Sequence, residues 1–157
     1  DDGVGYSSHK YGSWNVFYLH QHAMEFIKNV EKVPVLMGLL KKHLPRPFNH
    51  CFVSALTPGT HITPHYGPNN KKLRFHLPIM GCEGACLKVK DTIVELKEGA
   101  CIFKVNLLGK GYVFDDSFLH EAWHKGSETR VILIADFWHP DLTNVEMKFL
   151  SFLMNVG

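Results

Sequence analysis

The chain has 157 residues, of which 45% are hydrophobic and 20% charged, a composition ordinary for a soluble globular domain. Its formal net charge of +2 is too small to indicate a nucleic-acid partner, because a phosphate-binding face needs a clear basic excess or clustered Lys and Arg. The runs Lys41-Lys42 and Lys71-Lys72 are interpreted as solvated surface, and no stretch approaches the roughly 20 apolar residues of a membrane span.

The first 50 residues predict a strand followed by helices. Residues 14–20 are rich in aromatic and β-branched side chains, which favours a strand. From Gln21 onward apolar residues recur at three- and four-residue spacings, which is typical of a helix packed on a core. Pro34 suits the first turn of a second helical segment, and the stretch from Lys41 to Pro47 ends it.

From Cys51 onward the pattern changes to short apolar runs cut by Gly, Pro, Asn and Asp, which predicts antiparallel strands. The predicted strands are 51–57, 72–79, 85–89, 92–96, 100–104, 112–114, 119–124 and 129–137. Eight strands in two facing sheets make a jelly roll whose open end can hold a small ligand. We therefore expect a mainly β fold with N-terminal helices, a double-stranded β-helix of the jelly-roll, cupin-like kind.

We expect one domain over residues 1–157, with residues 1–50 as a strand and helical flank and residues 51–150 as the jelly-roll core. Because Asp1-Asp2-Gly3 has neither an initiator Met nor a signal-peptide pattern, we expect the chain to be a fragment of something longer.

Two residue types bear on metal and redox chemistry. Eleven histidines point weakly toward a metal, since His is the commonest metal ligand. The four cysteines include the pair Cys82 and Cys86, but no second pair follows to close a four-cysteine zinc site. Free thiols are the preferred interpretation, and a Cys82–Cys86 disulfide stays open as an alternative.

The segment from Thr60 to Asn70 holds two histidines among turn-forming residues and is interpreted as a loop that could present ligands. A helical zinc pair at His61 and His65 is rejected, because Pro64 disfavours helical geometry in the residue before it.

Two candidate iron ligands follow from comparison with the Fe(II) facial triad, in which a proximal H-x-D/E and a distal His leave three positions open. The proximal match is His65-Tyr66-Gly67, so the carboxylate position is a glycine. A polar turn delivers His120 at the start of an apolar strand. His65 is followed on one strand face by Arg74 and His76, and His120 is followed by Arg130. A buried guanidinium needs an anion, which a dicarboxylate would supply.

Three motifs carry a family resemblance. His65-x-Gly-Pro-x-Asn-x-x-Leu-Arg-x-His-Leu, Phe-Asp-Asp-Ser-Phe-x-His-Glu-x-Trp at 114–123 and Trp-His-Pro-Asp-Leu-Thr at 138–143 resemble the aspartyl/asparaginyl β-hydroxylase family over residues 51–150. Members of that family are jelly-roll oxygenases whose iron is bound by two histidines with no third protein ligand.

The resemblance implies a role for each matching residue. His65 and His120 would bind Fe(II), and Arg130 would pair with the distal carboxylate of 2-oxoglutarate. Ser54, Arg74 and His76 would hold its other end. Asp116 would orient a metal-bound water; capping of the turn, with Asp115, is the alternative.

The resemblance also implies the reaction: 2-oxoglutarate and O2 are consumed, succinate and CO2 are released, and a C–H bond is hydroxylated. Family members hydroxylate the β-carbon of Asp or Asn in EGF-like domains, so a protein or peptide substrate is expected. Some bacterial relatives act on lipid A. The compartment would be the endoplasmic reticulum lumen for an animal-type member and the cytoplasm for a bacterial-type member.

Two other interpretations stay open. Residues 104–113 look additional to the family pattern, either as a hairpin at Gly109-Lys110-Gly111 that leaves the barrel intact or as a disturbance that makes the chain an inactive member. A cupin-like protein that holds zinc or another divalent metal through the same histidines would have no need for Arg130.

Overall fold

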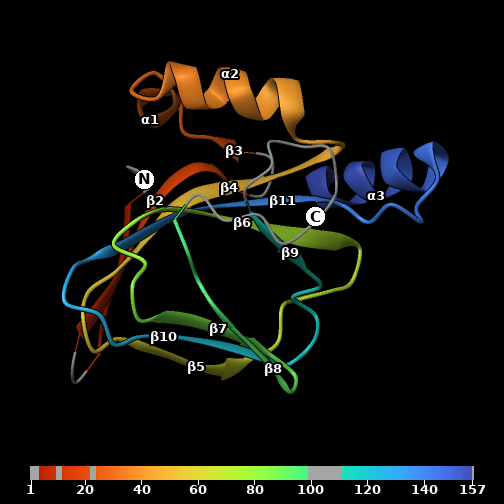
Figure 1. The fold of residues 1–157 in the computed structure, drawn as a ribbon. Coiled ribbons are helices and arrows are strands. Elements are labelled where there is room, and N and C mark those ends of the chain that lie inside the picture. The colour runs from red at the N-terminus through yellow and green to blue at the C-terminus, as the bar shows by residue number, and fades with distance from the viewer. Residues whose placement is uncertain (1–3, 10–11, 22–23, 99–110, 157) are drawn as a thin grey trace.

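Two antiparallel sheets face each other in the computed structural model, which describes residues 4–9, 12–21, 24–98 and 111–156 (Figure 1). The larger sheet has the strand order β1-β2-β4-β11-β6-β9 with β3 paired to β2, and the smaller has the order β5-β10-β7-β8. The strands are β1 (Val4–His9), β2 (Gly12–Gln21), β3 (Met24–Glu25), β4 (Pro47–Leu56), β5 (His61–His65), β6 (Lys72–Met80), β7 (Ala85–Val89), β8 (Thr92–Glu95), β9 (Tyr112–Phe114), β10 (His120–His124) and β11 (Arg130–Trp138). This is the predicted jelly roll.

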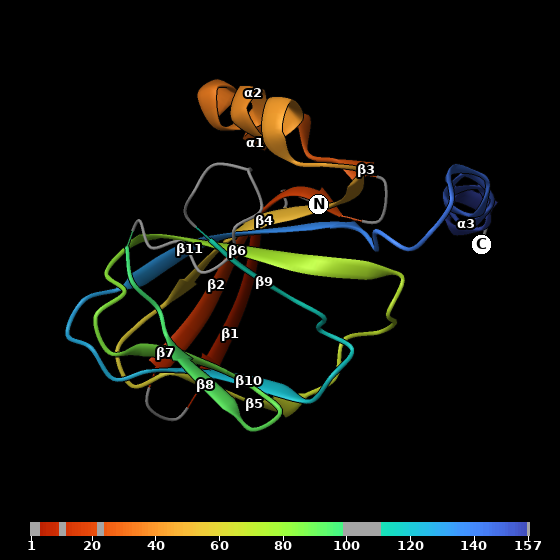
Figure 2. The same ribbon diagram turned by 45° about the vertical axis from the view of Figure 1, so that its right-hand side comes forward.

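Three helices complete the described fold. α1 (Ile27–Val30) and α2 (Pro34–His43) cover the outer face of the larger sheet. α3 (Asn144–Val156) follows β11 and lies beside the end of that sheet, away from the other two helices (Figure 2). Pro34 occupies the first turn of α2 as predicted, where its missing N–H has no intrahelical partner to lose. No helix within the described ranges is long and apolar enough to cross a membrane.

The alternation of side chains along the central strands builds two apolar layers. Ile132 and Ile134 of β11 pack between the sheets with residues such as Leu87 of β7. Leu133 and Ala135 point the other way, into a cluster that α2 covers. The larger sheet is therefore buried on both faces in its middle, which explains why β11 reads as a continuous apolar run.

Two sequence expectations on secondary structure were wrong. The segment containing His61 and His65 is the strand β5 and not a loop. β5 lies at the edge of the smaller sheet, where Pro64 removes no hydrogen bond from the interior of the sheet. The helical pattern also begins later than Gln21, because β2 continues to that residue and β3 follows.

Most of the other predicted strands are present in the structure. From Cys51 onward these strands match the prediction to within one residue at each end, except that β4 begins earlier, at Pro47 and not at Cys51. The predicted strand 100–104 and most of the 104–113 segment lie outside the described residues. Cys51, Cys82 and Cys86 are free thiols, so the Cys82–Cys86 disulfide is absent. Cys101 lies outside the described residues.

Candidate active site

His65 and His120 lie side by side in the smaller sheet. They end β5 and begin β10, and their Cα atoms are direct partners in the antiparallel register. Their ring centroids are 4.2 Å apart. Two residues that are 55 positions apart in the chain therefore present neighbouring imidazoles, as the sequence predicted.

The backbone sets the tautomer of both imidazoles. Nδ1 of His65 lies 2.8 Å from the carbonyl oxygen of Thr63, and Nδ1 of His120 lies 2.8 Å from that of Phe118. Because a carbonyl oxygen only accepts, each Nδ1 carries the proton and donates. Each Nε2 is then left with a lone pair, which is the form that binds a metal, and the bonds to the backbone hold the rings in place.

Burial favours the neutral form of His120. It lowers the pKa of this imidazole, and the nearby His65 ring lowers it further, against the opposing effects of the Phe118 carbonyl and the Asp116 carboxylate. A neutral imidazole needs no proton loss before it binds a metal.

Packing leaves no room for a side chain at position 67, the residue that would supply the third protein ligand of a facial triad. A Cβ atom on Gly67 would lie 2.5 Å from Cγ of Asp116, and the Gly67 N–H donates to the Asp116 carbonyl oxygen at 2.6 Å. A carboxylate side chain at position 67 has no room here. Among the described residues, no group of three or more His, Cys, Asp or Glu side chains is placed to hold a metal ion.

Asp116 belongs to a buried network of charges. Lys72 donates to both of its carboxylate oxygens, at 2.9 and 2.7 Å, and Arg74 lies 3.1 Å from it. The second carboxylate, Asp136, accepts from Nε and Nη2 of Arg74 at 2.8 and 2.9 Å and also contacts Lys72 and His50, each at 2.9 Å. Burial alone would raise the pKa of Asp136, but the hydrogen bonds from Arg74 and His50 and the charges of Arg74 and Lys72 hold it far below its usual value.

This network contradicts the expectation that Lys72 is solvated, and it bears on the expected role of Arg74. Lys72 is not solvated surface, since only 2% of it is exposed. Arg74 lies on the predicted face of β6, but two carboxylates already pair with its guanidinium. Asp115 caps the turn by accepting from the Ser117 N–H at 2.9 Å, whereas Asp116 turns inward. The capping alternative therefore applies to Asp115 alone.

Arg130, unlike Arg74, is a buried guanidinium that pairs with no carboxylate of the described residues. It is 2% exposed, and no Asp or Glu of the described chain pairs with it. Nη2 donates to Oγ of Ser54 at 2.9 Å, and Nε has no partner. Burial lowers the pKa of this guanidinium to about 10, partly opposed by the nearby Cys82. Burying a cation without an anion costs folding free energy. Among the described residues, Arg130 lacks the negative group that would offset this cost.

His76 and Ser54 add unused hydrogen-bonding capacity beside Arg130. Neither ring nitrogen of the buried His76 has a partner among the described residues. Its pKa lies well below the usual value, because of burial first and then the charges of Arg74 and Arg130. Oγ of Ser54 accepts from Arg130 and, at 3.0 Å, from Nε1 of Trp14, which leaves the hydroxyl proton free to donate.

These groups share one cavity of about 170 Å³ between the sheets. All six predicted binding residues line it: Ser54, His65, Arg74, His76, His120 and Arg130. The other walls are mostly apolar, with Trp14 and Phe52 among them. The seventh, Asp116, lies behind Gly67 and does not line the cavity. At about 30 Å³ per water the space suits a molecule of a few carbon atoms.

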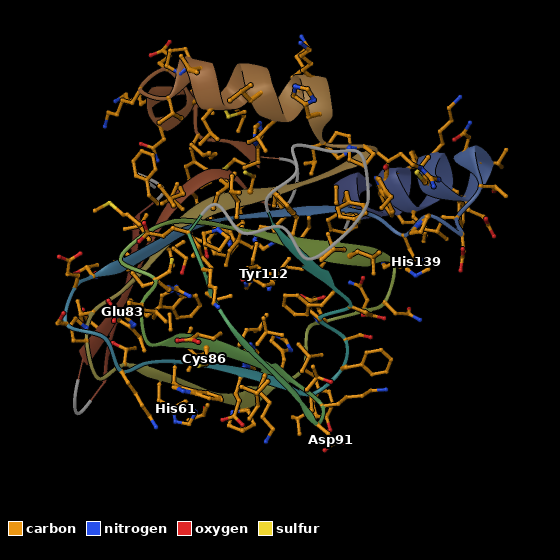
Figure 3. The ribbon with its side chains drawn as sticks, viewed as in Figure 1. His61, Glu83, Cys86, Asp91, Tyr112 and His139 are labelled. Atoms are coloured by element: carbon orange, nitrogen blue, oxygen red, sulfur yellow. The ribbon has the colours of Figure 1, made fainter. Side chains whose placement is uncertain are left out.

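Sequence reasoning missed Lys72, Asp136 and His50. Lys72 and Asp136 continue the inward-facing alternation of Arg74 on β6 and of Ile134 on β11, so period-two spacing could have identified both. The rejection of a helical pair at His61 and His65 is confirmed, because both residues lie on the strand β5. His61 is exposed on the smaller sheet (Figure 3) and pairs with Glu121 at 2.8 Å.

Solved structures with a similar fold are cupins. A predicted oxalate decarboxylase from Thermotoga maritima superposes with a TM-score of 0.53 at 11% identity, covering 88% of this chain and 95% of that one. The cupin domain of Cnp3 from Schizosaccharomyces pombe gives 0.52 at 8% identity, with 98% of this chain and 77% of that chain covered. At such identities the likeness concerns the fold alone.

Sequence comparison identifies the family. Residues 2–140 match the family model described as aspartyl/asparaginyl beta-hydroxylase. The human aspartate beta-hydroxylase domain-containing protein 2 is 35% identical over 93% of this chain, and the human aspartyl/asparaginyl beta-hydroxylase is 35% identical over 88%. An ornithine lipid ester-linked acyl 2-hydroxylase from Rhizobium tropici is 30% identical over 81%. The chain spans 39%, 18% and 42% of the lengths of these three relatives. It belongs to the aspartyl/asparaginyl β-hydroxylase family, a family of hydroxylases built on a cupin fold.

Proposed function

We propose that this chain is an Fe(II)- and 2-oxoglutarate-dependent hydroxylase that acts on the β-carbon of Asp or Asn in a peptide or protein. One observation carries the proposal. Two imidazoles with free Nε2 lone pairs, His65 and His120, line the same small cavity as Arg130, a buried guanidinium with no carboxylate partner in the described chain.

The residues fit the iron and its cosubstrate. His65 and His120 would hold Fe(II) through Nε2, since their Nδ1 protons are committed to the backbone. Arg130 would bind the distal carboxylate of 2-oxoglutarate with help from the Ser54 hydroxyl, because a guanidinium pairs strongly with a carboxylate. His76 would donate an N–H to its other end. When bound, Fe(II) and 2-oxoglutarate supply, with O2, the oxidation of an unreactive C–H bond, and succinate and CO2 are released.

The remaining residues act by holding the site. Lys72, Asp116, Asp136 and Arg74 form a nearly neutral, buried cluster that fixes the wall of the cavity. Asp116 fills the space beside Gly67, so the protein contributes two ligands and leaves the other positions to small molecules. A direct role for Arg74 in cosubstrate binding stays a prediction, as does orientation of a water by Asp116.

Iron-dependent release of succinate from 2-oxoglutarate tests the proposal. We expect His65→Ala and His120→Ala each to abolish it and to remove the weak visible band that anaerobic Fe(II) and 2-oxoglutarate give in the parent protein. The matched control is His61→Ala, because His61 lies on the same strand but does not line the cavity and is paired with Glu121. Turnover retained in both ligand variants would overturn the assignment. A parent protein that is folded but has neither band nor turnover would be an inactive family member.

Acyl-lipid hydroxylation is a second candidate function, favoured by the 30% identity to the Rhizobium tropici acyl 2-hydroxylase. The two candidates share the iron site and differ in substrate. Parallel assays with Asp- or Asn-containing EGF-like peptides and with an ornithine lipid, each analysed for a mass gain of one oxygen atom, separate them.

A further inference from the structure

A second, larger cavity of about 410 Å³ opens between α2 and the larger sheet. Its walls are apolar: Val30 of α1, Met37, Leu40 and Leu44 in and just after α2, and Pro47 at the start of β4. Met and Leu side chains adapt their shape to a flexible apolar ligand. At about 30 Å³ per water-sized group, the space holds roughly fourteen such groups. A single Leu or Phe side chain of a peptide would leave most of it empty.

The charged residues that line this cavity are one buried carboxylate, Asp136, and two exposed side chains, Lys41 and Glu25. His50, which contacts Asp136, also lines the smaller cavity that contains His65 and His120. Lys72, Arg74 and His50 already pair with the Asp136 carboxylate, so the buried part of the cavity offers no unpaired charge to a ligand. Lys41 lies at the exposed rim, whereas the other charged rim residue, Glu25, is 3.6 Å from His20. The charge pattern therefore favours an anionic group at the rim and hydrocarbon inside.

Gly38 is an exposed residue at the mouth of the cavity. It occupies the interior of α2, where glycine costs helix stability relative to alanine. A Cβ atom there would meet no heavy atom within 4 Å, so packing within the described protein does not require a glycine. Gly38 lines the cavity, and its lack of a side chain keeps the entrance open.

From these three observations we propose that the cavity binds the unbranched hydrocarbon chain of a fatty acid, with the carboxylate held at the rim by Lys41. The chain extends past Met37 and Leu44 toward His50, beside the wall of the smaller cavity. This site is separate from the iron site, and the proposal does not depend on the hydroxylase activity.

Displacement of a dansyl-labelled undecanoate tests the proposal on the full chain without iron or 2-oxoglutarate. A series of saturated fatty acids, each below its micellar concentration, should bind about fourfold more tightly per added CH2 until the cavity is full, since each buried CH2 contributes about a factor of four. The Gly38→Phe variant should weaken binding at least tenfold. The Lys41→Gln variant should weaken binding of the acids and leave binding of the matching alcohols unchanged.

Two variants on the same helix serve as controls. Val35→Phe adds the same ring at a position that is 76% exposed and does not line the cavity, and Gly38→Ala tests helix propensity alone. Both should bind as the parent does, with folding checked by circular dichroism. Equal loss in Gly38→Phe and Val35→Phe, affinity independent of chain length, or no displacement by any fatty acid would each overturn the proposal. None of these results would bear on succinate release, so the two proposals fail separately.

Discussion

The carboxylate of Asp116 occupies the space that a side chain at Gly67 would need. A Cβ atom at Gly67 would lie 2.5 Å from Cγ and 2.6 Å from Oδ2 of Asp116, well inside van der Waals contact. Lys72 holds that carboxylate from the other side with two hydrogen bonds. The glycine in the His65-x-Gly67 motif is therefore a packing requirement of this site.

Gly67→Asp should consequently fail to rebuild a facial triad. Overpacking typically costs about 1–3 kcal/mol of unfolding free energy, and a second carboxylate against Asp116 adds repulsion. The double variant Gly67→Asp/Asp116→Ala removes the Asp116 side chain that blocks position 67. It should recover part of the lost unfolding free energy, since Lys72 would regain a carboxylate nearby. Denaturant unfolding of the two single variants and the double variant gives the coupling energy. Additive costs would contradict the steric explanation.

Asp136 is the most connected carboxylate of the network, so its neutralisation should be severe. Asp136→Asn leaves Lys72 and Arg74 buried with one carboxylate between them. Breaking a buried ion pair costs about 3–5 kcal/mol. The midpoint of urea unfolding should fall accordingly, while Asp141→Asn, at an 89% exposed side chain, should leave it unchanged. A midpoint for Asp136→Asn equal to that of the parent would show that the network does not stabilise the fold.

Most of the barrel could be predicted because its strands are short apolar runs bounded by Gly, Pro and Asp, and that pattern is local. β5 could not, because Thr63, Pro64 and two histidines resemble a loop unless the strand is known to lie at a sheet edge. α3 was missed despite a readable signal. Thr143 and Glu146 form a capping box, in which the Glu146 carboxylate accepts from the Thr143 N–H at 2.8 Å and the Glu146 N–H donates to the Thr143 hydroxyl at 3.2 Å.

The six predicted binding residues share one cavity because motif spacing and strand alternation both act locally on β4, β5, β6, β10 and β11. The sequence could not show which charged side chains form ion pairs with one another. Arg74 and Arg130 look alike as strand arginines, yet one is paired with Asp136 and Asp116 and the other with no carboxylate of the described chain. That difference depends on a register between strands that are far apart in the chain.

Stability should fall as pH drops from about 7 to 5, because His76 is buried in its neutral form. Its folded pKa lies well below the ordinary 6.5, so the unfolded chain binds the proton first and unfolding is favoured below that pH. His120 contributes in the same direction. Each such group gives a slope of up to about 1.4 kcal/mol per pH unit.

Urea unfolding across this range measures the slope. In His76→Gln it should be smaller by up to one proton's contribution, while above pH 7.5 the parent and the variant should show the same pH dependence. An unchanged slope in His76→Gln would mean that another group titrates. Asp136 acts at lower pH, since a depressed carboxyl pKa adds stability above about pH 4 that is lost on further acidification.

Arg130→Met should make the ligand-free protein more stable and the ligand-bound protein less so. The buried guanidinium has one side-chain hydrogen bond, to Ser54, and no carboxylate partner within the described residues, so an apolar side chain of similar length removes an uncompensated charge. Replacing buried charges by packed apolar groups has stabilised proteins by about 1–4 kcal/mol, and a gain in that range is expected here.

Thermal unfolding with and without 2-oxoglutarate, with Mn(II) in place of iron to prevent turnover, measures both effects. At a hundredfold excess over its Kd, 2-oxoglutarate should stabilise the parent by about 2.7 kcal/mol and the Met variant far less. Pyruvate, which lacks the distal carboxylate, should stabilise the parent and the Met variant to a similar extent. A Met variant that is less stable than the parent and still stabilised by 2-oxoglutarate would show that the anion binds elsewhere.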